Sequence, residues 1–243
     1  MRLDIALTER GLVTTRTRAK AAILEGAVKV GGKIADKPSL EVSADDVIEL
    51  VPSSALRYVS RGGLKLEAAL SAFPVSTCDR VAIDIGASSG GFTDCLLQNG
   101  AKKVYAVDSG SGQLAQHLRT DPRVFSIENT NARYLDRSLF ADVTLAVMDV
   151  SFISQTMILP AIADILPSGG ELISLIKPQF EVGRAHIGKG GIVRKESARK
   201  EAIDRVKDAA TLLGLSFQGI IESPICGGDG NVEYLAYFRK DSL

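Results

Sequence analysis

Most of the chain, from about residue 62 onward, alternates short apolar runs with stretches of helical periodicity. Five runs of four to six mostly apolar residues are typical of strands that are buried on both faces of a sheet. Because helical stretches separate these runs, the pattern predicts a doubly wound α/β fold with a mostly parallel sheet. The expected strands are 81–85, 103–107, 124–127, 143–148 and 171–176, and the expected helices are about 91–99, 112–119, 153–166 and 196–213.

The last two apolar segments, residues 215–221 and 233–238, follow each other without a helix between them. Strands joined without a crossover helix pair antiparallel, so we expect an antiparallel pair at one edge of the sheet. Together with the five runs above, these segments predict a sheet of seven strands.

The first 56 residues have a different pattern, in which two short amphipathic segments precede three short β-prone pieces. A glycine ends each amphipathic segment, and Gly31-Gly32 joins the first two β-prone pieces as a hairpin turn. The expected elements are helices at 2–11 and 16–25 and strands at 28–30, 34–35 and 47–51. We therefore predict a small α+β domain over residues 1–56, a linker over 57–61 and the α/β domain over 62–243.

The composition is that of a globular protein, with 45% apolar residues and 29 Lys+Arg balanced by 29 Asp+Glu among 243 residues. The neutral total conceals two stretches, 10–37 and 184–200, that each carry an excess of five positive charges. Such clusters are typical of surfaces that bind nucleic acid, although the second also fits an ordinary solvated loop and helix face. The candidate RNA-binding residues are Arg10, Arg16, Arg18 and Lys20 in the first stretch and Arg184, Lys189 and Arg194 in the second.

Other features exclude several classes of protein. The three cysteines stand far apart and only two histidines accompany them, so we expect no metal site and no disulfide framework. Acidic residues at positions 4 and 9 lie where a secretory signal needs an apolar core, and no apolar run approaches the ~18 residues of a membrane span. We expect a cytoplasmic protein that does not enter a membrane.

A glycine-rich segment, Asp84-Ile85-Gly86-Ala87-Ser88-Ser89-Gly90-Gly91-Phe92-Thr93, follows the first predicted strand and leads into a helix. Three functions compete for it. A dinucleotide site requires GxGxxG, but its middle glycine is replaced by Ser88. A hydrolase nucleophile elbow requires GxSxG, which residues 86–90 satisfy, with Asp149 and His186 following in the required order. Against the hydrolase, this strand opens its domain, and His186 lies in a glycine-rich basic loop.

The third function is binding of S-adenosylmethionine, which has no pyrophosphate and needs a glycine-lined cradle and a carboxylate for its ribose hydroxyls. Asp108 ends the next strand, where the ribose-binding acid of an open α/β sheet is expected, although Ser109-Gly110 after it also fits a simple turn. The loop and the acid together favour a methyltransferase. The candidate cofactor-binding residues are Gly86, Ser88, Gly90 and Asp108, with Asn131 as a weaker candidate for the adenine edge or a turn residue.

Charged residues also follow two central strands, Asp149 after residues 143–148 and Lys177 after 171–176. Ligands of open sheets bind at the carboxyl ends of strands, whereas most Asp and Lys residues are solvated loop charges. Two such charges beside a cofactor loop favour a site.

Six motifs spread over the chain are SRGGLKL (60–66), DIGASSGGFTD (84–94), MDVSFIS (148–154), IKPQFE (176–181), KGGIVR (189–194) and GNVEYL (230–235). As a set they closely resemble the hemolysin A (TlyA) family of ribosomal RNA 2'-O-methyltransferases. The front module is similar to a small RNA-binding domain of a ribosomal protein and some pseudouridine synthases, and the second domain is similar to FtsJ-like RNA methyltransferases. The resemblance implies a Lys-Asp-Lys-Glu tetrad at Lys65, Asp149, Lys177 and Glu233.

The resemblance also implies a reaction, the methylation of a ribose 2'-hydroxyl of cytidine, with ribosomal RNA or ribosomal subunits as partners. A 2'-hydroxyl must lose its proton as it attacks, so a base is needed beside the methyl group. A nearby second cation favours a neutral lysine, and the resemblance makes Lys177 the base. From the residues alone, Lys65 and Lys177 remain alternatives. The competing function is a non-catalytic RNA-binding protein of ribosome assembly with a vestigial methyltransferase fold.

Overall fold

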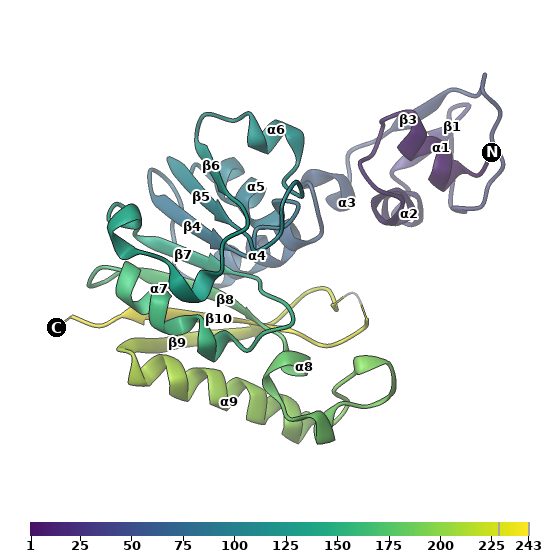
Figure 1. The fold of residues 1–243 in the computed structure, drawn as a ribbon. Helices are drawn as coiled ribbons and strands as arrows, with labels where there is room; N and C mark the ends of the chain where they lie inside the picture. Colours follow the sequence, from purple (N-terminus) through teal and green to yellow (C-terminus); the bar gives the residue numbers. More distant parts are fainter. Residues whose placement is uncertain (228, 243) are drawn as a thin grey trace. The chain divides into compact units, whose positions relative to one another are not determined.

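The computed structural model describes residues 1–227 and 229–242, and the chain packs into two compact units, Met1–Arg61 and Gly62–Leu243 (Figure 1). The boundary predicted at 56, with a linker over 57–61, stays a prediction, and two residues of that linker, Tyr58 and Val59, are buried.

The first unit is a small α+β fold whose three short strands pair antiparallel in the order β2-β1-β3. Its hairpin turns at Gly31-Gly32, which both have positive φ, and Val30 pairs with Lys33 across it, as predicted. Leu3, Leu7 and Ile23 are fully buried in its core. The elements are α1 (Leu3–Glu9), α2 (Arg16–Leu24), β1 (Val28–Val30), β2 (Lys33–Ile34), β3 (Ile48–Leu50) and α3 (Ser54–Arg57).

The second unit is built on a seven-stranded sheet in the order β6-β5-β4-β7-β8-β10-β9. The first five strands of this order are parallel, and β10 lies antiparallel between β8 and β9, which confirms the predicted fold class. The strands are β4 (Val81–Ile85), β5 (Lys103–Val107), β6 (Val124–Ile127), β7 (Leu145–Met148), β8 (Glu171–Ile176), β9 (Leu215–Glu222) and β10 (Tyr234–Lys240).

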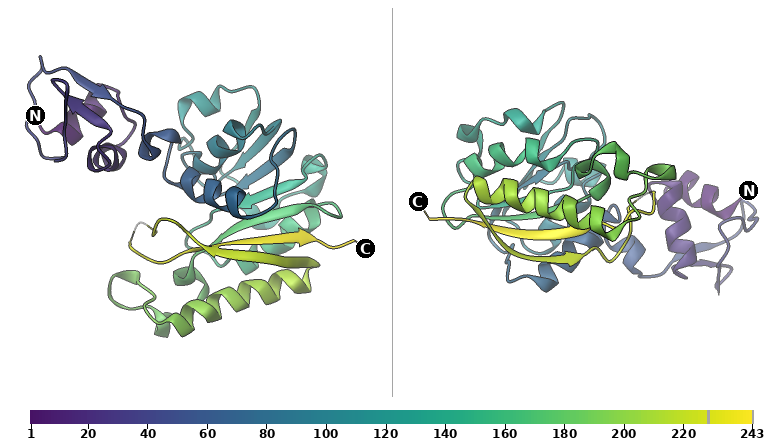
Figure 2. Two further views of the ribbon diagram at one scale, coloured as in Figure 1. Left: turned by 180° about the vertical axis from the view of Figure 1, so that it is seen from behind. Right: turned by 90° about the horizontal axis from the view of Figure 1, so that it is seen from below.

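Helices cover both faces of this sheet, with α4 and α5 on one face and α7 and α9 on the other (Figures 1 and 2). The apolar core lies largely between the sheet and α7 and α9, where Ile162, Val206 and Phe238 are buried. The helices are α4 (Gly62–Ala72), α5 (Gly91–Gln98), α6 (Gln116–Arg119), α7 (Leu159–Ile165), α8 (Pro178–Glu181) and α9 (Glu196–Leu212).

Three helices differ from the predictions. Helix α4 was not predicted, because two of the poorest helix formers, Gly62 and Gly63, open it. Helix α6 occupies only the end of the predicted 112–119, since Gly112 has φ +68° and Ala115, with ψ 141°, is also outside the helical conformation. In the predicted 153–166, α7 begins only at Leu159, after a 3₁₀ turn.

Candidate active site and nucleic-acid interface

The loop after β4 lies against the loop after β7, and a glycine makes that approach possible. Ile85 pairs with Met148 across the two parallel strands, so the next residues, Gly86 and Asp149, face each other. Gly86 has φ +85°, and a Cβ there would overlap the Asp149 carbonyl oxygen. Any other residue would push the two loops apart.

The Asp108 carboxylate fixes the glycine-rich loop. Its Oδ2 accepts the backbone N–H of Ser88 at 2.8 Å, and its Oδ1 accepts that of Gly110 at 2.7 Å. The second bond is the turn interaction that the sequence offered as an alternative, while the first joins Asp108 to the loop itself. Ser88 is held at φ +48°, a conformation that costs energy for a residue with a Cβ.

These residues line a cleft of about 490 Å³ at the carboxyl ends of β4, β5 and β7. Gly86, Ser88, Asp108, Asn131 and Asp149 are among its lining residues, so the structure brings together four of the five cofactor candidates. Asn131 also accepts the backbone N–H of Arg133 at 3.1 Å and so caps a 3₁₀ turn.

Gly90 has a different position from the other cofactor candidates. It caps the N-terminus of α5 with φ +95° and is not among the lining residues that the structure describes for this cleft. A Cβ there would overlap Leu118, which packs against it. A glycine at position 90 is therefore explained by packing.

Asp84 was not singled out from the sequence, although it is a carboxylate inside the central strand β4. The side chain is fully buried, and Thr93 donates a hydrogen bond to its Oδ2 at 2.6 Å. Its Oδ1 has no hydrogen-bond partner among the described residues. Burial, together with repulsion from Asp149 and Asp108, raises the pKa of Asp84 to about 7. The sequence feature that could have identified Asp84 is a single acidic residue within an otherwise apolar strand.

The four tetrad candidates form two ion pairs. Lys177 Nζ lies 2.6 Å from Asp149 Oδ1 and donates to Ser151 Oγ at 2.7 Å. Lys65 Nζ, in α4, donates to Glu233 Oε2 at 2.5 Å, with both side chains at most 10% exposed. The antiparallel register of β8 and β10 explains how distant residues meet, because Tyr234 pairs with Ile176 and thereby sets Glu233 beside Lys177.

A second cleft, of about 330 Å³, adjoins this arrangement and is lined by Lys177 and Glu233. Ser151 and Phe152 line both clefts, so the loop after β7 separates them. Phe152 is 91% exposed and has φ +65°, while its ring lies 5.2 Å from that of Phe180. A bulky, strained and exposed aromatic side chain at this position is a feature of binding sites rather than of packing.

A hydrolase triad is not formed. Ser88 Oγ contacts Gln113, Asp149 pairs with Lys177, and His186 lies 3.9 Å from Glu201. Because the three residues have separate partners, the GxSxG match does not create a nucleophile elbow.

In the first unit, three of the four basic candidates, Arg10, Arg16 and Arg18, have intramolecular partners that help to hold the fold together. Arg10 donates to backbone carbonyls between Ser43 and Asp46, and Arg18 donates to the carbonyl of Leu56. Lys20 is exposed. The sequence predicted the positive charge of this stretch but not these intramolecular partners.

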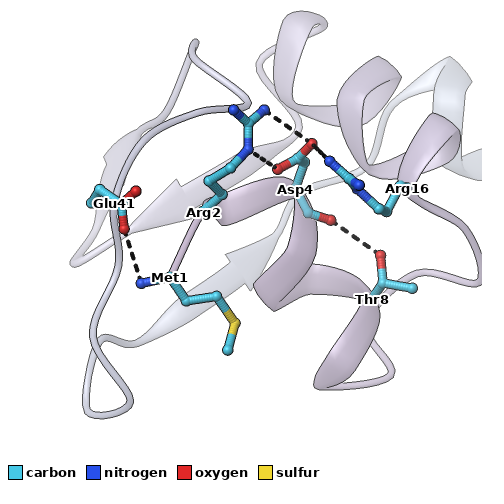
Figure 3. A network of polar contacts seen from close by, with 6 residues as sticks. All are labelled: Met1, Arg2, Asp4, Thr8, Arg16 and Glu41. Carbon is cyan, nitrogen blue, oxygen red and sulfur yellow. Dashed lines mark hydrogen bonds and ion pairs between the residues drawn. The ribbon is translucent and has the colours of Figure 1, made fainter.

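Arg16 belongs to a network around Asp4, which Figure 3 shows. The fully buried Asp4 carboxylate accepts from Arg2 Nε and from Arg16 NH2, both at 3.0 Å. The hydrogen bond from Arg2 and the charges of both arginines lower the pKa of Asp4 to about 2. Two partly exposed guanidinium groups share one carboxylate, so the cluster keeps a net positive charge.

The second basic stretch borders the second cleft. Arg184, Lys189 and Arg194 are exposed, and the loop that carries them contributes Ile187 and Gly191 to the cleft wall. Asn231 is buried and fixes this loop, since it accepts from Val193 N at 2.9 Å and donates to Gly191 O at 3.0 Å.

Residues 1–227 and 229–242 contain neither a metal-binding cluster nor a membrane-spanning helix. In this part of the chain no group of three or more His, Cys, Asp or Glu side chains is placed to hold a metal ion. None of the helices in the same ranges is both long and apolar enough to cross a membrane.

The family of FtsJ-like methyltransferases matches residues 58–240, and the S4 domain matches residues 1–48, so the second unit is of the FtsJ-like methyltransferase class. The 16S/23S rRNA (cytidine-2'-O)-methyltransferase TlyA of Mycobacterium tuberculosis is 42% identical over 99% of this chain and 90% of its own. YqxC of Bacillus subtilis, described as a candidate rRNA methyltransferase, is 48% identical over 98% of this chain and 85% of its own.

A solved structure of a candidate hemolysin from Streptococcus thermophilus has a TM-score of 0.78 and 47% identity, covering 100% of this chain and 89% of its own. Structures of S-adenosylmethionine-dependent methyltransferases share the fold alone, at 14–16% identity. The chain belongs to the hemolysin A (TlyA) family.

Proposed function

We propose that this chain is an S-adenosylmethionine-dependent 2'-O-methyltransferase that acts on the ribose of a cytidine in ribosomal RNA. The observation that carries the proposal is the junction of the two clefts. Asp149 lines the glycine-rich cleft, its ion-pair partner Lys177 lines the second, and Ser151 and Phe152 lie between them. A donor and an acceptor of a methyl group bound in adjoining clefts would meet beside Lys177. The relative from Mycobacterium tuberculosis is named as an rRNA (cytidine-2'-O)-methyltransferase, which supports this choice of substrate.

The residues of the first cleft fit S-adenosylmethionine. Gly86 lets the loops after β4 and β7 lie together at the cleft, and Asp108 is a carboxylate at the cleft wall for ribose hydroxyls. Asp84 is not among the described lining residues, but it directly precedes two that are, Ile85 and Gly86. Its buried Oδ1 has no hydrogen-bond partner in the described part of the chain and would suit the ammonium of the cofactor. Gly86, Ser88, Asp108 and Asn131 would hold the cofactor, and Gly90 would shape the start of α5.

The chemistry follows from the position of Lys177. The bound cofactor supplies a methyl group on a sulfonium, which is a strong electrophile. Lys177 would first lose a proton to solvent, and its neutral Nζ would then accept the proton of the 2'-hydroxyl as that oxygen attacks, while Asp149 and Ser151 keep the amine in place. Lys65 is not among the described residues that line either cleft, and its amine is taken up by Glu233. This difference in access supports Lys177 over Lys65 as the base.

Phe152 would hold the nucleotide whose ribose reacts. Aromatic side chains bind unstacked bases by stacking, which contributes about 1–3 kcal/mol per base. The side chain is almost wholly exposed and lines both clefts, next to Ser151, which contacts Lys177. Stacking of the nucleobase on Phe152 would hold the ribose near Lys177.

Positive charge in both units would bind the RNA backbone. We propose that residues 1–56, which contain the matched S4 domain, dock ribosomal RNA or a ribosomal subunit. Arg2, Arg16 and Lys20 supply charge there, and Arg184, Lys189 and Arg194 supply it beside the second cleft. An enzyme with this substrate acts in the cytoplasm.

The proposal is tested by transfer of a tritiated methyl group from S-adenosylmethionine to ribosomal RNA or subunits that lack the modification. We expect label in RNA that is recovered as 2'-O-methylcytidine after nuclease digestion. RNA that already carries the methyl group at the target ribose is the control and should accept none. Absence of label, together with no heat of cofactor binding in calorimetry, would contradict the proposal.

Asp108→Ala should weaken cofactor binding by about 1–3 kcal/mol, the cost of a lost hydrogen bond to a charged group. Because Asp108 also holds the loop through Ser88, the ribose contact needs a separate test. Calorimetry with S-adenosylhomocysteine and its 2'-deoxy analogue provides this test. The analogue should bind the wild type more weakly than S-adenosylhomocysteine does, whereas the two compounds should bind Asp108→Ala equally well. Equal losses in both proteins would assign Asp108 to the loop alone.

A further inference from the structure

The loop after β7 is attached to the segment after β8 at a second place, which follows Phe152 in the sequence. Glu181 Oε2 accepts the hydroxyl of Ser154 at 2.6 Å, and Oε1 accepts the backbone N–H of Gln155 at 2.8 Å. Glu181 is 2% exposed, and burial raises the pKa of its carboxyl. Both of its oxygens are therefore used to hold one short loop.

The side chain of Gln155 continues this attachment into the sheet. The Gln155 amide donates to the carbonyl of Leu175 at 2.5 Å and accepts the hydroxyl of Ser174 at 2.6 Å, both in β8. Gln155 and Ser174 are buried, so these bonds are made away from water. Bonds of this kind are costly to leave unmade.

The two attachments enclose the residues that separate the clefts. At one end Lys177 contacts Asp149 and Ser151, and at the other end Glu181 holds Ser154. Between these points lies Phe152, at a positive φ that a phenylalanine adopts only when its neighbours impose it.

We propose that Glu181 is a positioning residue for the reaction, because it fixes the loop of residues 149–155 against residues 177–181. The proposal rests on the proposed function, since it gives the loop its role. Without Glu181 the loop would lose two of its fixed points, and Phe152 and Ser151 would sample positions from which the ribose does not meet Lys177. A misplacement of about 1 Å reduces turnover by up to about 10²-fold.

Glu181→Ala should lower kcat by about 10- to 100-fold, counted per molecule that binds cofactor, and change the KM for RNA less. Glu181→Gln should retain most of the activity, because the amide can accept from the Gln155 N–H and donate to Ser154 Oγ. A residue that only stabilises the fold would lose activity in proportion to the folded fraction, and activity per cofactor-binding molecule would not change.

Glu171→Gln is the matched control. Glu171 begins β8, whereas Glu181 follows the other end of that strand. Glu171 accepts hydrogen bonds from Arg80 and from Tyr237. Its loss should reduce stability and leave turnover per cofactor-binding molecule unchanged. An equal fall in that turnover for Glu171→Gln and Glu181→Ala would overturn the proposal.

A second measurement does not depend on methyl transfer. The chain has no tryptophan, so Phe152→Trp places a single fluorescent reporter on the loop. In that background Glu181→Ala should lower the fluorescence anisotropy of the tryptophan, while Glu181→Gln and Glu171→Gln should not. If Glu181→Ala does not fold, Ser154→Ala removes only one bond to Glu181 and should lower the anisotropy to a smaller extent.

The two readouts separate the two proposals. If Glu181→Ala lowers the anisotropy but the wild type transfers no methyl group, the proposed function is contradicted. The conclusion that Glu181 fixes the loop then still holds. Unchanged anisotropy in both Glu181→Ala and Ser154→Ala contradicts the role of Glu181, whatever the activity.

Discussion

Replacing Lys177 by alanine should reduce methyl transfer by about 10²-fold or more and leave cofactor affinity nearly unchanged. The reason is that Lys177 lines the second cleft, whereas four of the five cofactor candidates line the first. Lys177→Arg should not restore activity, because a guanidinium stays protonated and cannot accept the proton. Single-turnover transfer of labelled methyl groups measures the loss, and calorimetry measures the affinity.

Lys102→Ala is a suitable control, since this exposed lysine precedes β5 at the amino ends of the strands, away from the clefts. Near-normal turnover of Lys177→Ala would remove this residue from proton transfer. Lys65→Ala is a poorer test of a catalytic role, because it leaves the buried Glu233 carboxylate without its cation. The double variant Lys65→Met, Glu233→Gln removes both charges and is the appropriate comparison.

The sheet could be predicted because its central strands are continuous apolar runs, which have few other interpretations. Val81–Ile85, Lys103–Val107 and Glu171–Ile176 match the predicted bounds, and so does the edge strand Val124–Ile127. Helix bounds were less accurate where glycine or a 3₁₀ turn interrupts the pattern, as at Gly112 and before Leu159. Local periodicity does not register such interruptions.

Pairings within the site depend on register, which no local pattern contains. The positions of Asp149 and Lys177 after adjacent strands indicated a site. The position of Glu233 beside Lys177 requires β10 to lie antiparallel to β8, and its contact with Lys65 requires α4 to pack against β10. The resemblance to a known family named Lys65 and Glu233, and the structure shows how they meet.

Burial was the property that the sequence conveyed least. Asp4 and Glu181 look like ordinary surface acids in the sequence, and both are buried with specific donors. Arg16 likewise looks like a free cation, yet it shares the carboxylate of Asp4 with Arg2. A charge can be counted from the sequence, but its partner depends on tertiary packing.

Asp84→Asn should make the second unit more stable at neutral pH and change how its stability depends on pH. The folded-state pKa of Asp84 is raised from 3.8 to about 7, so folding favours the protonated carboxyl. The stabilisation from that proton is complete below about pH 4 and is lost as the pH rises through about 7. A difference of this size corresponds to about 4 kcal/mol.

Urea unfolding between pH 4 and pH 8 tests this prediction. Relative to Asp84→Asn, the wild type should lose about 4 kcal/mol of unfolding free energy across this range, because asparagine keeps an acceptor for Thr93 and carries no charge. Asp121→Asn is a control of opposite sign, since Arg123 lowers the pKa of Asp121 and its stabilisation is lost only as the pH falls. Parallel pH profiles for wild type and Asp84→Asn would contradict the raised pKa.

The same variant should bind S-adenosylmethionine more weakly, although it is more stable. An ammonium placed at Asp84 Oδ1 would favour the charged carboxylate that burial disfavours, so cofactor binding should release a proton near pH 7 in the wild type. Calorimetry in buffers of different ionisation enthalpy measures that proton, and Asp84→Asn should show none. A stabilising substitution that removes both the proton release and part of the affinity would identify Asp84 as a buried charge retained for ligand binding at the expense of stability. Unchanged affinity and proton release in the variant would instead assign Asp84 a structural role alone, through its bond with Thr93.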